Sequence, residues 1–110
     1  MTHLYEIFKG DDLKIAERIQ KLRLQMLVHS YIYYRMDQNI LSDYEWSSRG
    51  VELARLQNAH PKIAKKVEWA KEFADWDGSS GAALPLDNPW VKGKAEQIVK
   101  IHDHLTAKDR

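Results

Sequence analysis

Apolar residues recur three or four positions apart through most of this chain, which is the spacing of amphipathic helices. The first such run extends from about residue 12 to residue 36. Its apolar positions are Leu13, Ile15, Ala16, Ile19, Leu22, Met26, Val28, Ile32 and Met36. Asp11 or Asp12 stands where a carboxylate can cap the free backbone N–H groups of this helix. The pattern therefore predicts one long first helix.

A second helix is predicted from Ser42 to about Asn58. Ser42 followed by Glu45 has the capping-box pattern, in which each side chain accepts a hydrogen bond from the backbone N–H of the other residue. Gly50 lies inside this helix. It either weakens the helix by about 1 kcal/mol relative to alanine or marks a close contact with another segment. Together the first two stretches predict a helical hairpin.

The C-terminal half predicts two further helices separated by a long irregular stretch. Pro61 suits the first turn of a third helix, because the N–H that proline lacks is not needed there, and helical spacing continues to about Ala74. Residues 75–88 are rich in turn-forming residues and predict a loop. Asn88-Pro89 predicts the start of a last helix that ends near residue 106. Its predicted buried face comprises Val91, Ala95, Ile98, Val99, Ile101 and Leu105.

No stretch alternates in the manner of a strand, so we predict an all-α fold with four main helices. The length of 110 residues fits a single domain over 1–110. The chain has no cysteine, which excludes disulfides and thiolate chemistry, and no histidine or carboxylate spacing is typical of a metal site. A net charge of +1 gives no electrostatic case for nucleic acid or membrane binding. Neither a secretory signal nor a membrane-spanning run is evident, so a cytoplasmic protein is expected.

The residues best suited to bind a ligand lie around the turn between the first two helices. Asp43, Trp46 and Ser47 are spaced i, i+3 and i+4, so they share one face of the second helix. Tyr33 and Tyr34 lie across the turn at the end of the first helix. Aromatic rings beside a carboxylate suit a flat, cationic ligand, for which the ring quadrupoles add roughly 0.5–2 kcal/mol.

The stretch from His29 to Pro61, HSYIYYRMDQNILSDYEWSSRGVELARLQNAHP, resembles the N-terminal domain Ia of bacterial NAD-dependent DNA ligases. That family shows His-x-Tyr-x-Tyr followed by His or Tyr, then an Asp-x-Glu-Tyr-Asp segment, and then a helix ending in His-Pro. The chain can be placed on this pattern without a gap. The ligase-like part would cover about residues 12–61, with a helical extension over about 62–106.

The resemblance implies binding of NAD, or of its nicotinamide mononucleotide half. In the family, tyrosines stack on the nicotinamide, and acidic residues engage the ring amide and the ribose. Carried over, Tyr33 is the stacking tyrosine, Tyr34 takes the adjacent position, and Asp43 is an aspartate of the family. Trp46 replaces the second tyrosine and can stack equally well. Ser47 replaces the last aspartate and brings no charge.

The modules that ligation requires find no match in the chain. The catalytic lysine of a Lys-x-Asp-Gly motif is missing, because Asp75 stands where that lysine would be in Asp75-Trp76-Asp77-Gly78. The resemblance therefore implies a non-catalytic, stand-alone binding protein, of a kind that would fit a bacteriophage gene. No metal is expected, and direct contact with nucleic acid is not expected.

Two alternatives remain beside nucleotide binding. The aromatic cluster can equally form a core or an interface, with the ligase-like hairpin serving only as the scaffold of a protein–protein interaction or inhibitor module. The apolar surface of the first helix makes a homodimer an open alternative. Trp76 and Trp90, on either side of the predicted loop, are candidate interface anchors.

Overall fold

The computed structural model describes residues 3–108, with side chains up to Thr106. Five helices follow one another: α1 (Leu4–Ile7), α2 (Gly10–Met36), α3 (Asp43–Ala59), α4 (Pro61–Ala64) and α5 (Pro89–Lys108). No strand occurs within the described range. The predicted all-α fold is confirmed. Only three of the five helices are long, however, where four were expected.

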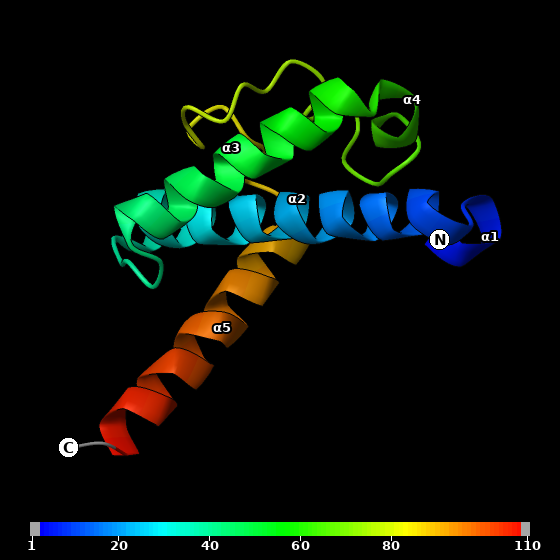
Figure 1. Cartoon of the computed structure of the whole chain (residues 1–110). Helices are drawn as coiled ribbons and strands as arrows, with labels where there is room; N and C mark the ends of the chain where they lie inside the picture. The colour runs from blue at the N-terminus through cyan, green and yellow to red at the C-terminus, as the bar shows by residue number, and fades with distance from the viewer. Residues whose placement is uncertain (1–2, 109–110) are drawn as a thin grey trace.

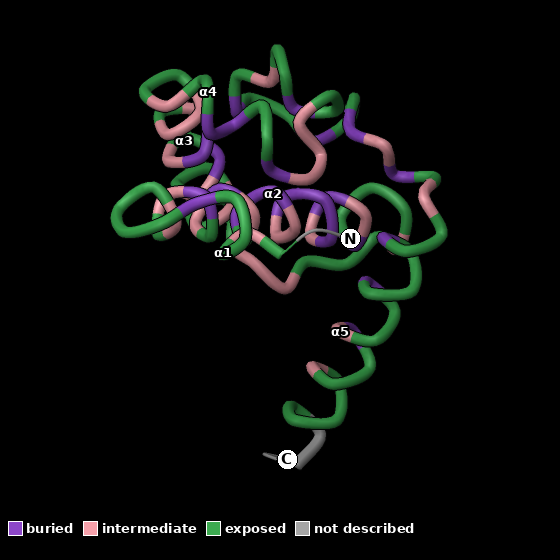
Figure 2. Tube along the Cα trace, turned by 90° about the vertical axis from the view of Figure 1, so that its right-hand side faces the viewer, coloured by how far each residue is buried: buried purple, intermediate pink, exposed green. Residues whose placement is uncertain are grey.

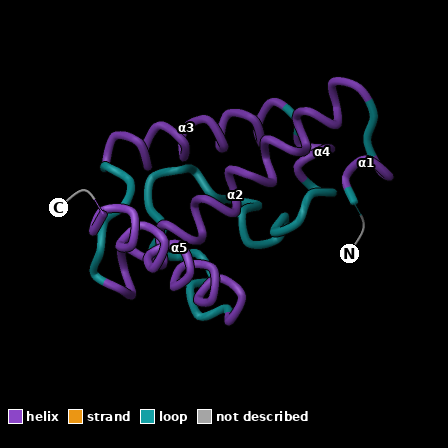
Figure 3. Tube along the Cα trace, turned by 90° about the horizontal axis from the view of Figure 1, so that it is seen from below, coloured by secondary structure: helices purple, strands orange, loops and turns teal. Residues whose placement is uncertain are grey.

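Helix α2 is the central element, and the others pack around it (Figure 1). Helix α3 runs back along α2 and forms the predicted hairpin, while α5 crosses α2 from the opposite side (Figures 1 and 3). Burial follows this arrangement, because one long face of α2 is covered along most of its length. Its fully buried apolar residues are Ala16, Ile19, Leu22, Met26, Leu27 and Ile32.

Both ends of the hairpin turn are determined by local chemistry. Helix α2 ends where Asp37 adopts a left-handed conformation (φ 52°), which aspartate tolerates better than most residues. Helix α3 begins with the predicted capping box: the N–H of Glu45 donates to Ser42 Oγ at 3.1 Å, and the N–H of Ser42 donates to Glu45 Oε1 at 3.2 Å. The turn therefore holds the first turn of α3 close to the end of α2.

The start of α2 differs from the prediction. The helix begins at Gly10 and its N-cap is Lys9, which makes no side-chain capping bond. Asp11 and Asp12 therefore lie in the first turn and do not cap it. There their carboxylates still interact favourably with the helix dipole. The preceding residues also form the short α1, which was not predicted.

The third helix predicted from Pro61 to about Ala74 is wrong beyond its first turn, because α4 ends at Ala64. Farther along, Arg23 takes up the carbonyl groups that a helix continued past Val67 would need. Its side chain projects from α2 and Nη1 donates to the carbonyl oxygens of Val67 and Glu68, both at 3.0 Å. Those carbonyls therefore bond a side chain instead of continuing a helix, and the chain reverses at Trp69 with a φ of 69°.

Residues 75–88, here called the strap, are irregular as predicted and lie across the α2–α3 hairpin (Figure 1). Leu84 and Leu86 are buried in the main core, and Trp76 packs against its edge. The strap is therefore a fixed part of the fold.

Helix α5 begins as predicted, with the Asn88 side chain accepting hydrogen bonds from the N–H groups of Trp90 at 2.8 Å and Val91 at 3.3 Å. Val91, Ala95 and Val99 are buried as predicted, with Ala95 and Val99 in one cluster with Val28 and Ile32 of α2 and Ile98 partly buried beside it. Beyond Val99 the helix projects from the body of the molecule (Figure 2). The prediction that Ile101 and Leu105 are buried is wrong, since they are 53% and 58% exposed.

Candidate functional site

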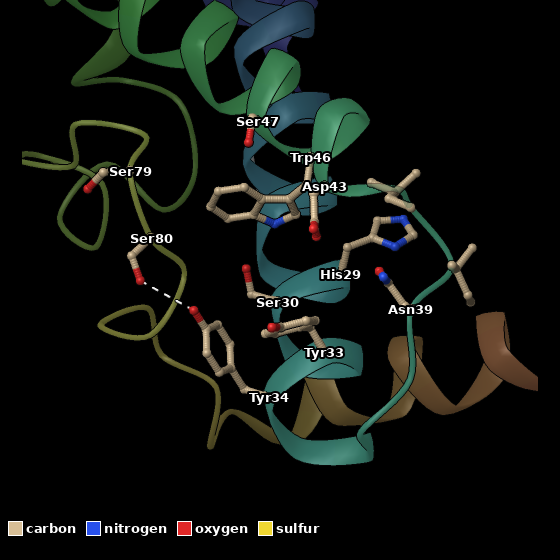
Figure 4. A pocket seen from close by; sticks show the side chains of 12 residues that line it. His29, Ser30, Tyr33, Tyr34, Asn39, Asp43, Trp46, Ser47, Ser79 and Ser80 are labelled. Carbon is tan, nitrogen blue, oxygen red and sulfur yellow. Dashed lines mark hydrogen bonds between the residues drawn. The ribbon is translucent and has the colours of Figure 1, made fainter.

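The residues singled out from the sequence meet around one pocket at the α2–α3 turn (Figure 4). Its volume is about 210 Å³, below the range of about 300–1,000 Å³ that drug-sized ligands occupy. The lining residues are His29, Ser30, Tyr33, Tyr34, Asn39, Ile40, Leu41, Asp43, Trp46, Ser47, Ser79 and Ser80. All of the predicted site residues, Tyr33, Tyr34, Asp43, Trp46 and Ser47, are among them. The pocket has room for one ring system and its nearest substituents.

The hairpin positions the aromatic walls. Tyr33 and Tyr34 meet edge to face at the end of α2, with ring centroids 4.9 Å apart. Trp46 lies one helical turn into α3, which the Ser42–Glu45 capping box holds in place. Behind it the ring of Trp76 packs edge to face at a centroid distance of 6.1 Å. The Trp46 ring is therefore supported from the strap side and presents its other surface to the pocket.

The strap closes one side of the pocket with Ser79 and Ser80, which the sequence did not single out as site residues. Two glycine contacts allow this close approach. Gly78, with a φ of 85°, lies so near Gly50 of α3 that a Cβ atom there would meet the Gly50 carbonyl oxygen at 2.8 Å. A Cβ atom on Gly81 would come within 2.1 Å of Ser30 Oγ. Of the two explanations for Gly50, the structure supports the close contact.

The remaining unpredicted lining residues come from α2 and the turn. His29 begins the ligase-like stretch, but it was not among the predicted site residues. Ser30 is 1% exposed, and its hydroxyl has no hydrogen-bond partner among the described residues. Asn39, Ile40 and Leu41 line the pocket because the turn passes beside it. No sequence signal distinguishes a turn residue that lines a pocket from one that faces solvent.

The pocket has a negative character. Asp43 supplies a carboxylate, and no lysine or arginine is among the described lining residues. Burial, with a smaller contribution from the nearby Arg49, lowers the pKa of His29 to about 4, and Glu45 partly opposes this shift. His29 is therefore neutral at pH 7. A cationic, flat ligand suits this environment better than an anionic one.

The depressed pKa of His29 predicts a loss of stability in mild acid. In the unfolded chain the imidazole takes up a proton near its ordinary pKa of about 6.5, whereas in the folded chain it does so only near 4. The folded state therefore keeps its full stability with respect to His29 above pH 6.5. It loses stability progressively as the pH falls from 6.5 to 4. Allowing for partial exposure, we expect a loss on the order of 1–2 kcal/mol. Denaturant unfolding at pH 7 and pH 4.5 measures it.

Replacement His29→Gln should flatten this part of the pH profile. His104→Gln is the matched control, because His104 lies at an exposed position on α5. Equal slopes in the wild type and His29→Gln between pH 7 and 4.5 would contradict the assignment.

The described part of the chain carries neither a metal-binding cluster nor a membrane-spanning helix. Within residues 3–108, no group of three or more histidines, aspartates or glutamates is arranged to hold a metal ion. Over the same range no helix combines the length and apolar character that crossing a bilayer requires.

Comparison with known proteins identifies the family. The sequence model described as DNA ligase-like, N-terminal NAD+-binding domain matches residues 12–66, which is half of the chain. The chain belongs to this family, and the resemblance based on the His29-to-Pro61 stretch is confirmed. The matched region supplies the α2–α3 hairpin and most of the pocket, whereas the strap lies outside it.

Individual relatives are bacterial DNA ligases. The chain is 42% identical over 87 residues to a DNA ligase of Desulfitobacterium hafniense, covering 72% of this chain and 13% of that enzyme. It is 37% identical over 54 residues to a DNA ligase of Oleidesulfovibrio alaskensis, covering 49% and 8%. A DNA ligase of Flavobacterium johnsoniae is 40% identical over 51 residues, covering 46% and 8%. The chain thus spans only a small fraction of these enzymes, and no solved structure matches it significantly.

Proposed function

We propose that this chain binds the nicotinamide mononucleotide half of NAD in the pocket at the α2–α3 turn. One observation carries the proposal: Tyr33, Tyr34, Asp43, Trp46 and Ser47, selected by family pattern, all line the same pocket. The family match to an NAD+-binding domain supports the choice of ligand. The pocket volume of about 210 Å³ favours one half of the dinucleotide over the whole.

The proposal gives each contact a role. Tyr33 and Trp46 stack against the nicotinamide, whose cationic ring is attracted by their faces. Asp43 provides the single carboxylate, favourable both for the ring charge and as a hydrogen-bond acceptor for the ring amide. Ser47 stands where the family has a second aspartate, so its hydroxyl replaces a charged contact by a neutral one. Affinity should therefore be modest.

The proposed role is binding and not catalysis. Adenylation needs a nucleophilic lysine, and Asp75 occupies the corresponding position of the only Asp-Gly segment that resembles the ligase motif. That segment instead builds the strap: Asp77 Oδ1 accepts hydrogen bonds from the backbone N–H of Ser79 at 2.9 Å and from its hydroxyl at 2.6 Å.

A titration with nicotinamide mononucleotide tests the proposal. Intrinsic tryptophan fluorescence should be quenched saturably, since Trp46 lines the pocket, and calorimetry should give the same dissociation constant. Replacement Trp46→Ala should weaken binding by about 10-fold or more, because stacking and cation–π contacts together contribute roughly 1–2 kcal/mol. Trp46→Phe keeps an aromatic ring and should weaken binding less.

Trp90→Phe is the control for these measurements. Trp90 is 44% exposed on α5 and does not line the pocket. Its loss should alter total fluorescence but leave the dissociation constant unchanged. Absence of both heat and quenching at millimolar ligand would rule out a working nucleotide site.

That negative outcome would favour a second function, in which the hairpin is the scaffold of a protein-interaction module or a homodimer. The observation behind this alternative is on α5. Its C-terminal half projects from the body of the molecule, and Ile101 and Leu105 are exposed there (Figure 2). Trp46→Ala would then affect folding or partner binding alone.

A further inference from the structure

One face of α5 carries large apolar side chains that the fold leaves exposed. Trp90, Ile101 and Leu105 are 44%, 53% and 58% exposed. Because successive residues of an α-helix are about 100° apart, Trp90 and Leu105 both lie within about 40° of Ile101 around the helix axis. The three residues therefore form one stripe, roughly 22 Å long at a rise of about 1.5 Å per residue. It runs beside the buried face and onto the part of α5 that projects from the molecule (Figure 2).

Trp69, in the turns after α4, extends this stripe at its N-terminal end. The ring centroids of Trp69 and Trp90 are 6.2 Å apart and their planes are inclined at 42°. Trp69 is half-buried and packs against the main core, so it gives the Trp90 ring a fixed support. A supported, partly exposed tryptophan is the kind of side chain that most often dominates the affinity of a protein interface.

The charge on the stripe is positive. Lys94 lies about 20° from Ile101 around the axis, and its Nζ atom is 5.8 Å from the centroid of the Trp90 ring. The acidic residues of α5 up to Thr106 are Glu96 and Asp103, which lie about 140° and 160° from Ile101, on the opposite side of the helix. The apolar face of α5 is therefore accompanied by a lysine and separated from the carboxylates.

The turns beside Trp69 have the same distribution of charge. Lys66 and Lys71 are exposed there. Glu68 instead lines a separate hollow beside α1, and Glu72 is close enough to Arg23 to oppose the lowering of its pKa. An apolar surface bordered by lysines is complementary to an apolar surface bordered by carboxylates.

A second copy of the chain does not provide that complement. A parallel pairing of two α5 stripes would bring the Lys94 ammonium groups of both copies together. An antiparallel pairing that sets Trp90 against Leu105 would place Lys94 opposite Ile101, without a counter-ion. Like charges and unpaired buried charges both oppose association, so the charge pattern favours a different, acidic partner.

We propose that the α5 stripe, extended by Trp69, binds an amphipathic helix of a partner protein that is apolar on one face and acidic along its borders. Apolar side chains of the partner contact Trp90, Ile101 and Leu105, as in other complexes that seat a helix on an apolar surface, and a carboxylate pairs with Lys94. This surface is separate from the pocket at the α2–α3 turn, and the proposal does not depend on nucleotide binding there.

Calorimetry on the full chain with a designed peptide tests the proposal. The probe is an acetylated and amidated helical peptide of about five turns, made of alanine and glutamate with leucine at every third or fourth position. One matched peptide carries lysine in place of glutamate, and another carries glutamine in place of leucine. We expect saturable binding of the leucine–glutamate peptide and at least about 10-fold weaker binding of both matched peptides, because each lacks one half of the complementarity.

Single substitutions on α5 locate the interface. Ile101→Ala and Lys94→Glu should each weaken binding of the leucine–glutamate peptide about 5-fold or more. Lys92→Glu is the charge-matched control, because Lys92 lies about 180° from Ile101 on the same helix. Val51→Ala is the control for apolar truncation, since Val51 is 54% exposed on α3. All four variants should remain folded by circular dichroism and bind nicotinamide mononucleotide as the wild type does.

Several outcomes would overturn the proposal. The first is no heat with millimolar leucine–glutamate peptide, and the second is equal weakening by Lys94→Glu and Lys92→Glu. A dimer in sedimentation equilibrium that Ile101→Ala dissociates would make the stripe an interface between copies of this chain. Tighter binding of oligodeoxythymidine or of phosphatidylserine vesicles than of the peptide, lost in Lys94→Glu, would assign the stripe to nucleic acid or to a membrane surface.

Discussion

Replacement of Arg23 by methionine should destabilise the protein by about 2–4 kcal/mol, a large part of the roughly 5–15 kcal/mol that domains of this kind possess. Arg23 is 1% exposed, and its Nη1 atom bonds the carbonyls of Val67 and Glu68. Its Nε atom also donates to Gln57 Oε1 at 2.9 Å. Methionine fills similar space but leaves these acceptors without a donor.

The buried guanidinium also carries a cost that moderates the effect. Burial lowers the pKa of Arg23 to about 10, so the charged form is less favourable here than in water although it persists at pH 7. The ring of Phe73 compensates in part, with its centroid 5.8 Å from the guanidinium carbon. Removing the charge relieves this cost, but the loss of the hydrogen bonds should dominate.

Urea unfolding followed by circular dichroism measures the effect, and Arg18→Met is its control. Arg18 makes a bidentate ion pair with Glu52, but both side chains are 40% exposed. Exposed pairs contribute about 0–1 kcal/mol. A loss at Arg23 no larger than that at Arg18 would show that the turns over 65–73 do not depend on the buried arginine.

Arg23 also explains why the segment after Pro61 could not be predicted from the sequence. Apolar periodicity identified α2 and α3 because their stability comes from one continuous buried face, and the capping box located the start of α3. The segment after Pro61 has the same periodicity, yet its carbonyls bond a side chain more than 40 positions earlier in the chain. Local patterns contain no information about such a partner.

The residues of the candidate site were likewise predictable only in part. Tyr33, Tyr34, Asp43, Trp46 and Ser47 were predictable, because helical spacing and a short turn bring them together. Ser79 and Ser80 were not, since their place depends on how the strap packs. Gly50 was the available signal: a glycine inside a helix often marks the close approach of another segment, which here is Gly78.

Replacement of Gly81 by alanine should displace the strap and weaken nicotinamide mononucleotide binding by about 10-fold or more. The added Cβ would lie 2.1 Å from Ser30 Oγ, 2.7 Å from Ser30 Cβ and 3.3 Å from a ring carbon of Trp46. Ser30 is in the buried part of α2 and has little freedom to move, so the strap must shift. Such overpacking typically destabilises a protein by about 1–3 kcal/mol.

The displacement should affect the pocket because Gly81 follows Ser80, and the added Cβ would press against the Trp46 ring. Moving this segment alters one wall and the support of the stacking ring at once. Hydrogen exchange should show faster exchange over residues 76–82, with α3 unchanged, while calorimetry reports the affinity. Unchanged affinity combined with faster exchange would show that the strap wall does not contribute to the site.

Gly93→Ala is the matched control, because a Cβ there would meet no atom within 4 Å. It lies within α5, where alanine should stabilise the helix by up to about 1 kcal/mol and leave binding intact. Pairing Gly81→Ala with Ser30→Gly removes both close Ser30 atoms and should recover binding in part, although glycine weakens α2. Recovery in the double variant would trace the defect to this single contact, because changes at distant sites add independently whereas those in contact do not.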